Sequence, residues 1–179
     1  MTNQRKTFFT SYTGFGRENI IQMRNRKYSD VLDMNHDIIE KWNDAVTDDD
    51  IVYHLGNFGI ERTLINTTLS WLNGKIYIIP SNDDGELREV MTNGPEHANV
   101  TIIDHEIVTL PEYDVVISHY PLLDWPGKEL GVLNLHGQSL WFDRHDFVEG
   151  RVNVGTDFWN YTPVELSQVR TFVEGVRGK

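Results

Sequence analysis

The sequence of 179 residues contains no cysteine, which excludes disulfide bridges and thiolate metal sites. It has no apolar run near the roughly 18 residues that a membrane helix needs. Its first residues, MTNQRK, lack the apolar core of a signal peptide. We therefore expect a cytoplasmic protein with no membrane contact. No repeat, low-complexity tract or linker interrupts the chain, so residues 1–179 are expected to form one domain.

Basic residues are also scarce. The chain has 16 Lys and Arg against 27 Asp and Glu, and its formal net charge is −11. This balance argues against direct nucleic-acid binding, because a phosphate backbone would be repelled. The basic residues Arg17, Arg24, Arg26 and Lys27 form the one convincing cluster, and a solvated helix face is the interpretation that we favour.

The apolar pattern of the first half predicts alternating strands and helices. Strands are predicted at Thr7–Ser11, Ile51–Leu55 and Lys75–Ile79. Helices are predicted at Asp33–Val46, Ile60–Leu72 and Gly85–Met91. This order favours a parallel sheet with right-handed crossovers, and ligands bind outside the carboxyl ends of such strands.

The second half is predicted to consist mostly of strands joined by tight connections. They are expected at Val100–Ile103, Glu106–Leu110, Val115–Ser118, Val132–Leu135 and Arg151–Gly155. A helix over Pro163–Val173 is expected to end the chain, with Pro163 near its first turn. The whole pattern predicts an α/β protein.

Several segments carry a resemblance, in the order FFTS-YTGFGREN, VYHLGNF, LNGKIYIIPSNDD, VVISHYPL, NLHGQSL and VNVGTDFWNYTPVEL. Together they resemble the small, phage-type calcineurin-like metallophosphoesterases over nearly the whole chain. The resemblance implies a four-layer α-β-β-α sandwich. In that family, the loops of two sheets meet over two divalent metal ions.

The metal-binding motifs of this family are mostly replaced here. Its Asp-X-His positions fall on Tyr12 and Gly14, and the Asp that bridges both metals falls on Asn57. Its Gly-Asn-His-Asp/Glu motif reads Ser81-Asn82-Asp83-Asp84, in which Asp83 takes the place of the catalytic His.

The last two motifs complete the comparison. The fourth keeps its metal-binding residue as His119, whereas the His positions of the fifth, Gly-His-X-His, fall on Gln138 and Leu140. Of the metal ligands that the resemblance implies, Asn82 and His119 remain as residual candidates.

These replacements predict that no two-metal site forms and that no cofactor is bound. Two divalent ions about 3.5 Å apart repel each other by about 19 kcal/mol at an effective dielectric of about 20. Bridging carboxylates offset that repulsion. Asn57 is neutral and Gly14 has no ligand atom, so the offset is lost.

We therefore expect a catalytically inactive protein that acts by binding. It is expected to be a phage accessory protein whose partner is a host protein, bound through the former active-site face. The expected binding rim around the former active site is Phe15, Arg17, Phe58 and Trp125, because aromatic residues are enriched in interfaces. The same aromatic residues could equally fill the emptied pocket. Two alternatives stay open. One is a phosphoester or nucleotide hydrolase with a single metal such as manganese near Asn82, Asp83, Asp84 and His119. The other is a metal-free phosphate or nucleotide sensor that uses Arg17.

Overall fold

Two facing sheets form the centre of the protein. The computed structural model describes residues 5–138 and 150–178. The five-stranded sheet has the order β4-β3-β2-β1-β9. Its strands are β1 (Thr7–Thr10), β2 (Ile51–His54), β3 (Lys75–Ile78), β4 (Val100–Ile102) and β9 (Val164–Glu165). The first four are parallel, and β9 runs antiparallel to β1.

The second sheet has four strands in the order β5-β6-β7-β8. They are β5 (Ile107–Leu110), β6 (Val115–Ser118), β7 (Leu133–His136) and β8 (Arg151–Asn153). Strands β6, β7 and β8 are parallel, whereas β5 is an antiparallel edge strand. The chain is therefore an α/β protein with two mixed sheets, and the expected fold class is confirmed to that extent.

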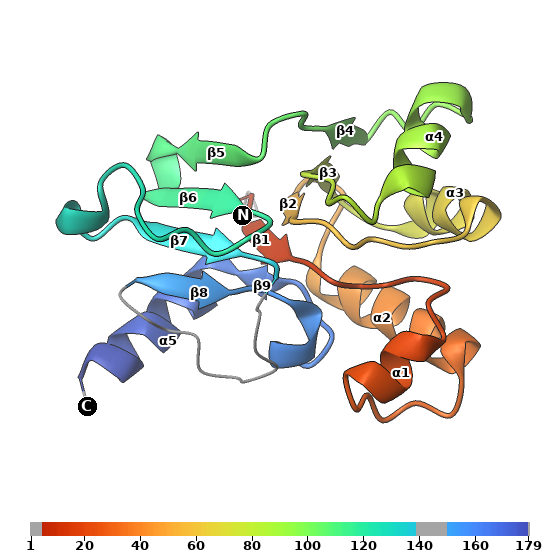
Figure 1. The fold of residues 1–179 in the computed structure, drawn as a ribbon, viewed down its shortest axis with the longest axis horizontal. Helices are drawn as coiled ribbons and strands as arrows, with labels where there is room; N and C mark the ends of the chain where they lie inside the picture. The colour runs from red at the N-terminus through yellow and green to blue at the C-terminus, as the bar shows by residue number, and fades with distance from the viewer. Residues whose placement is uncertain (1–4, 139–149, 179) are drawn as a thin grey trace.

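The helices divide between the two sides of the five-stranded sheet. Figure 1 shows α1 to α4 gathered on one side and the second sheet with α5 on the other. The helices are α1 (Asn19–Met23), α2 (Val31–Ala45), α3 (Arg62–Trp71), α4 (Gly85–Asn93) and α5 (Leu166–Arg177). Three short 3-10 turns are η1 (Pro111–Tyr113), η2 (Lys128–Leu130) and η3 (Thr156–Phe158).

Two apolar cores lie on the two faces of the five-stranded sheet. Successive residues of a strand point to opposite faces, so Phe8 packs in the core beneath α2 and α3, whereas Phe9 packs in the core between the sheets. Side chains from both sheets and from α5 share the second core. This packing brings the strand ends of the two sheets to the same region.

The predicted elements agree with the structure except at three places. The expected final helix begins at Leu166 and not at Pro163, because Val164 pairs with Phe9 and extends the sheet as β9. The short helix α1 and strand β9 were not expected. Both are too short for a periodic apolar pattern, and β9 forms only because β1 offers it a partner.

Arg26 is a buried ion-pair residue and not part of a solvated helix face, so that interpretation of the basic cluster is wrong for it. Its side chain pairs with both carboxylate oxygens of Asp157, at 2.7 and 3.1 Å. It also donates to the carbonyl oxygens of Tyr12 and Thr13, at 2.6 and 2.9 Å. A single guanidinium thereby joins the loop after β1 to η3, whose Asp157 lies 131 residues after Arg26 in the chain.

We expect Arg26→Lys to lower the free energy of unfolding by about 2 kcal/mol, because an ammonium cannot keep four donors in this planar arrangement. Urea denaturation measures the change. Arg88→Lys is the matched control, since the Arg88–Asp104 pair is exposed and its replacement should change stability by less than about 0.5 kcal/mol. Equal effects of the two substitutions would contradict a structural role for Arg26.

Candidate functional site

The carboxyl ends of β1, β2 and β3 meet those of β6 and β7. The backbone N–H of Tyr12 donates to the Gly56 carbonyl at 3.0 Å, and the N–H of Gln138 donates to the His119 carbonyl at 2.8 Å. The Ser11 hydroxyl donates to the carbonyls of Leu55 and Gly56, at 3.0 and 2.9 Å. These bonds join four of the segments that the resemblance assigns to a metal site. The loop after β1 is bonded to the loop after β2, and the loop after β7 is bonded to the loop after β6.

Two glycines allow this close approach. A Cβ atom at Gly137 would lie 2.0 Å from the Ser11 Oγ, and one at Gly56 would lie 2.7 Å from the His119 Nδ1. Gly56 also has a φ of +89°, which favours glycine. Glycine is therefore required where the loops of the two sheets cross.

Asp84 anchors the loops that follow β2 and β3. Its side chain is fully buried and accepts from the N–H groups of Asn57 and Phe58, at 2.7 Å each, and from the Ser81 N–H at 2.8 Å. The Ser81 hydroxyl lies 2.7 Å from the same carboxylate. Because its acceptor positions already face donors, Asp84 is a positioning residue and not an available ligand.

Asn57 links the two sheets directly. Its side-chain Nδ2 donates to the Gln138 Oε1 at 3.2 Å, and the Ser81 Oγ lies 3.0 Å from its Oδ1. Asn57 is 4% exposed. A carboxylate at this position could not donate to the Gln138 oxygen. The two amides therefore form a neutral contact at the place where the resemblance implies a bridging carboxylate and a histidine.

His54 lies behind these loops, fully buried, in a chain of hydrogen bonds. The Gly56 N–H donates to its Nδ1 at 3.2 Å, so Nε2 carries the proton and donates to the Thr13 hydroxyl at 3.0 Å. That hydroxyl donates to the Phe58 carbonyl at 2.9 Å. The pKa of His54 is lowered to about 4, chiefly by burial; the Asp84 charge opposes this shift, and His119 adds to it.

His119 is the best-preserved ligand candidate. Its Nδ1 lies 2.6 Å from the Leu55 carbonyl and donates to it, which leaves Nε2 as the acceptor of a neutral ring. The ring is 5% exposed and meets Tyr120 edge to face, with centroids 4.6 Å apart. Asn82, the other residual candidate, is exposed and lines a small pocket together with His119.

The donor set does not fit a pair of divalent metals. Asn57 and Gln138 bond to each other, Asp84 is saturated, and Asp83 lies 3.5 Å from Arg17 in an ion pair. Within residues 5–138 and 150–178, no three His, Asp or Glu side chains are grouped to hold a metal ion. In the part of the chain that the structure describes, no carboxylate is placed to bridge two cations and offset their repulsion. Leu140 lies outside the described residues.

The loop after β1 keeps an unusual backbone. Tyr12 has a φ of +62° and Gly14 a φ of +65°, in the left-handed region that bulky residues rarely adopt. The Tyr12 ring does not lie over Asn57. It packs beneath the guanidinium of Arg24, 4.0 Å from the ring centre. A Cβ atom at Gly14 would lie 2.7 Å from the terminal methyl group of Ile20.

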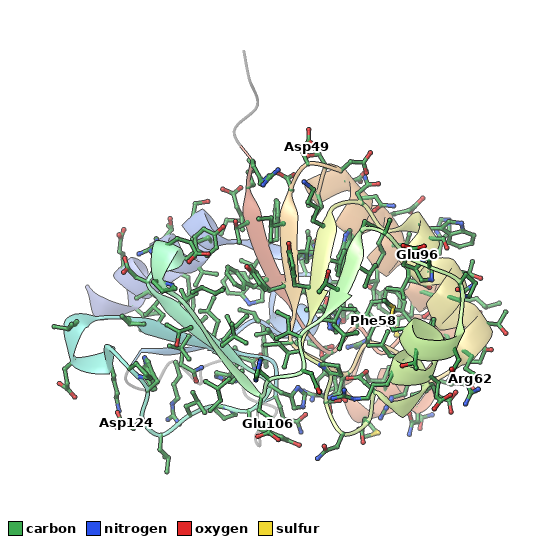
Figure 2. The ribbon with its side chains drawn as sticks, turned by 90° about the horizontal axis from the view of Figure 1, so that it is seen from above. Asp49, Phe58, Arg62, Glu96, Glu106 and Asp124 are labelled. Carbon is green, nitrogen blue, oxygen red and sulfur yellow. The ribbon has the colours of Figure 1, made fainter. Side chains whose placement is uncertain are left out.

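The expected aromatic binding rim is wrong for three of its four residues. Phe15 and Phe58 are fully buried and pack against each other, with ring centroids 5.2 Å apart, as parts of the core beneath the helices. Figure 2 shows Phe58 inside the molecule at the end of the strands, with Asp49 at their opposite end. Trp125 is 5% exposed and donates to the Val132 carbonyl. Arg17 remains partly exposed, in its pair with Asp83.

Sequence reasoning did not predict the hydrogen-bonding roles of the polar residues that hold the site together. Ser81 and Asp84 were assigned only to the family motif, and Ser11 and Thr13 were given no role, whereas all four bond to the loops. The one available signal was the turn Ser81-Asn82-Asp83-Asp84 before a helix, where a carboxylate commonly accepts backbone N–H groups. That signal does not say that the N–H groups come from the loop after another strand.

Comparison with known proteins gives relatives without an assigned activity. The chain matches no protein-family model. It is 29% identical over 185 residues to an uncharacterised protein of Methanocaldococcus jannaschii, covering 96% of this chain and 93% of that protein. Its fold is similar to the crystal structure of a protein of unknown function from Aquifex aeolicus, with a TM-score of 0.70, 21% identity and coverage of 94% and 100%. No helix among the described residues is long and apolar enough to cross a membrane.

The buried neutral His54 predicts that stability falls in mildly acidic solution. Its pKa is about 4 in the folded state and about 6.5 in the unfolded state, so the unfolded chain binds the proton more tightly. The contribution is complete above pH 6.5 and is lost as the pH falls toward 4. We expect a loss of about 2.5 kcal/mol between pH 7.5 and pH 4.5, measured by urea denaturation.

His97, whose pKa burial also lowers, adds to the same trend, so His97→Gln serves as the control. The acidic residues Asp37, Asp50 and Glu165 have lowered pKa values, and their contributions are lost only below about pH 4.5. A flat profile in the His97→Gln variant between pH 7.5 and pH 4.5 would show that His54 is not buried as a neutral ring.

We expect Asn57→Asp to destabilise the protein by about 2 kcal/mol at pH 8, because the new carboxylate would share Ser81 with Asp84 in a site that excludes water. The loss should be smaller at pH 5, where the raised pKa of the new group lets it bind a proton. Asn82→Asp makes the same charge change at an exposed neighbour and should alter stability by less than about 0.5 kcal/mol. A pH-independent loss would rule out the charge as its cause.

Proposed function

We propose that this protein is a catalytically inactive, metallophosphoesterase-like protein that acts by binding a protein partner through the face where the strand ends meet. The two facing sheets, with helices outside the five-stranded sheet, support the four-layer α-β-β-α sandwich that the sequence motifs imply. In this arrangement α5 packs against the sheet pair near β1 and β9.

The observation that carries the proposal is the hydrogen bond between Asn57 and Gln138. These two positions would hold metal in an active enzyme, and here they satisfy each other without a charge. Because the residues at the two replaced positions bond to each other, we infer that this region is maintained in a form that does not use metal. The fold around that contact remains tightly bonded through Asp84 and Ser11.

The contacts of the acidic residues count against a hydrolase with a single metal. The Asp84 carboxylate already accepts hydrogen bonds from three backbone N–H groups, and Asp83 is paired with Arg17. The same pair counts against an anion sensor that uses Arg17, because a phosphate would approach a carboxylate as well. Neither alternative is favoured by a specific contact.

The partner is proposed to be a protein, since the net charge of −11 disfavours nucleic acid and anionic membranes. The phage-type resemblance suggests a host protein as the target in the host cytoplasm. Full-length similarity to proteins of an archaeon and a bacterium fits a cellular partner as well. The proposed binding of a protein partner is the same whether that partner belongs to a phage host or to the protein's own cell.

Metal titration of the purified protein tests the inactive state. We expect no more than about 1 °C of change in melting temperature on adding excess Mn²⁺, and no hydrolysis of bis(p-nitrophenyl) phosphate above the rate in buffer, because the donor set lacks a bridging carboxylate. The variant Tyr12→Asp, Asn57→Asp, Asp83→His, Gln138→His restores four motif positions. It should gain a Mn²⁺-dependent thermal shift.

This variant leaves Gly14 unchanged, because a side chain there would press on Ile20. Aspartate is also better suited than tyrosine to the left-handed backbone at position 12. Manganese-dependent hydrolysis by the unaltered protein, abolished by His119→Ala, would overturn the proposal. A variant with four restored positions that folds but ignores Mn²⁺ would contradict the assignment of the motifs.

A further inference from the structure

A small pocket opens between the two sheets beside His119. Its volume is about 110 Å³, and residues of β5, the β3–α4 loop and the segment after β6 line it. Apolar walls come from Ile79, Ile107 and Leu122, and polar atoms come from Glu106, Asn82 and His119. Tyr120 completes the wall. The pocket is therefore lined by both aliphatic and polar residues, several of which carry acceptor groups.

This lining suits the side chain of an arginine or lysine. Such a side chain has an apolar stem that packs against aliphatic walls and a cationic end that needs acceptors. Glu106 supplies a carboxylate, and the His119 Nε2 is an acceptor because Nδ1 donates to the Leu55 carbonyl. The Tyr120 ring offers a face to a cation.

An apolar surface continues outward from the pocket. Ile107 and Tyr120 are 51% and 50% exposed, and Leu123 and Leu130 are 86% and 89% exposed. Ile107 and Tyr120 line the pocket, and Leu123 directly follows Leu122, which lines it as well. Leu130 ends the 3-10 turn η2, whose Lys128 Nζ donates to the Leu123 carbonyl at 3.0 Å. Three large exposed apolar side chains at or next to one pocket are typical of a surface that binds a partner.

Acidic residues surround this apolar surface. Glu106, Asp124 and Glu129 have no ion pair with any of residues 5–138 or 150–178. Figure 2 shows Glu106 and Asp124 along the same edge of the molecule. The Lys128 side chain lies over the Trp125 ring, 5.0 Å from its centre. The surface therefore offers unpaired negative charge around an apolar centre.

We propose that this surface, formed by the pocket and by Ile107, Tyr120 and Leu123, binds a basic segment of a protein partner. An arginine or lysine of that segment enters the pocket beside Glu106, and its apolar neighbours cover Leu123. The proposal rests on the proposed binding function and assigns it a location and a class of ligand. It replaces the buried Phe15, Phe58 and Trp125 as the contact residues.

Charge favours a basic partner over a second copy of this chain. In a symmetric pair formed through this surface, Glu106, Asp124 and Glu129 of one copy would face the same carboxylates of the other copy. Like charges at such a contact oppose association, whereas a basic segment is attracted to it. The total charge of −11 acts in the same direction.

Fluorescence polarisation with a labelled peptide, Gly-Arg-Leu-Lys-Leu-Arg-Gly, tests this inference on the full chain. We expect the peptide to bind, its acidic counterpart Gly-Glu-Leu-Glu-Leu-Glu-Gly not to bind, and binding to weaken as salt increases. Glu106→Gln and Leu123→Ser should each weaken binding by about fivefold or more. Both positions are exposed, so neither substitution threatens the fold.

Matched controls make the same changes elsewhere. Glu96→Gln and Leu32→Ser alter exposed residues away from the pocket and should leave peptide binding unchanged. Equal binding by the Glu106→Gln and Leu123→Ser variants, binding of the acidic peptide, or no binding of the basic peptide would each overturn the inference. A dimer in sedimentation that Leu123→Ser dissociates would also overturn it, in favour of a second copy. None of these results bears on metal binding or hydrolysis, which test the proposed function separately.

Discussion

The junction of the two sheets depends on the buried carboxylate of Asp84. It gathers N–H groups from the loops after β2 and β3, and so fixes the backbone on which Asn57 is presented to Gln138. Ser11 and Gly137 complete the crossing from the β1 and β7 sides. The Asp84 carboxylate within one sheet and the neutral Asn57–Gln138 contact between the sheets thus hold the strand ends together.

The same bonding explains why most of the proposed partner surface lies beside the region that the resemblance assigns to a metal site, with Asn82 and His119 belonging to both. Aromatic residues near the strand ends are drawn into the core, because Phe15 and Phe58 fill space between the loops and the helices. Ile107 of β5 and Tyr120 and Leu123 of the segment after β6 stay exposed, and other exposed apolar side chains, such as Leu32 and Trp71, lie on the helices.

Much of the fold could be predicted from the sequence, because strands and helices of ordinary length leave periodic apolar patterns. The strand at Val115–Ser118 was predicted with its observed ends, and most other ends differ by one to three residues. The assignment of Asn57, His119 and Gln138 to one region was also possible, since each follows a predicted strand. The burial of Phe15, Phe58 and Trp125 was not predictable, because nothing in the local sequence distinguishes an aromatic residue at a binding rim from one in a core.

The sequence by itself determined the α/β class, the order of the strands along the chain, and the absence of a side chain at Gly14 and of a negative charge at Asn57. These are properties of residue type and local pattern. The tertiary structure alone decided which polar groups meet: that Arg26 pairs with Asp157, that Asp84 accepts from the loop after β2, and that Asn57 donates to Gln138. Such pairs join residues 26 to 131 positions apart, and only the packing of the two sheets brings them within hydrogen-bonding distance.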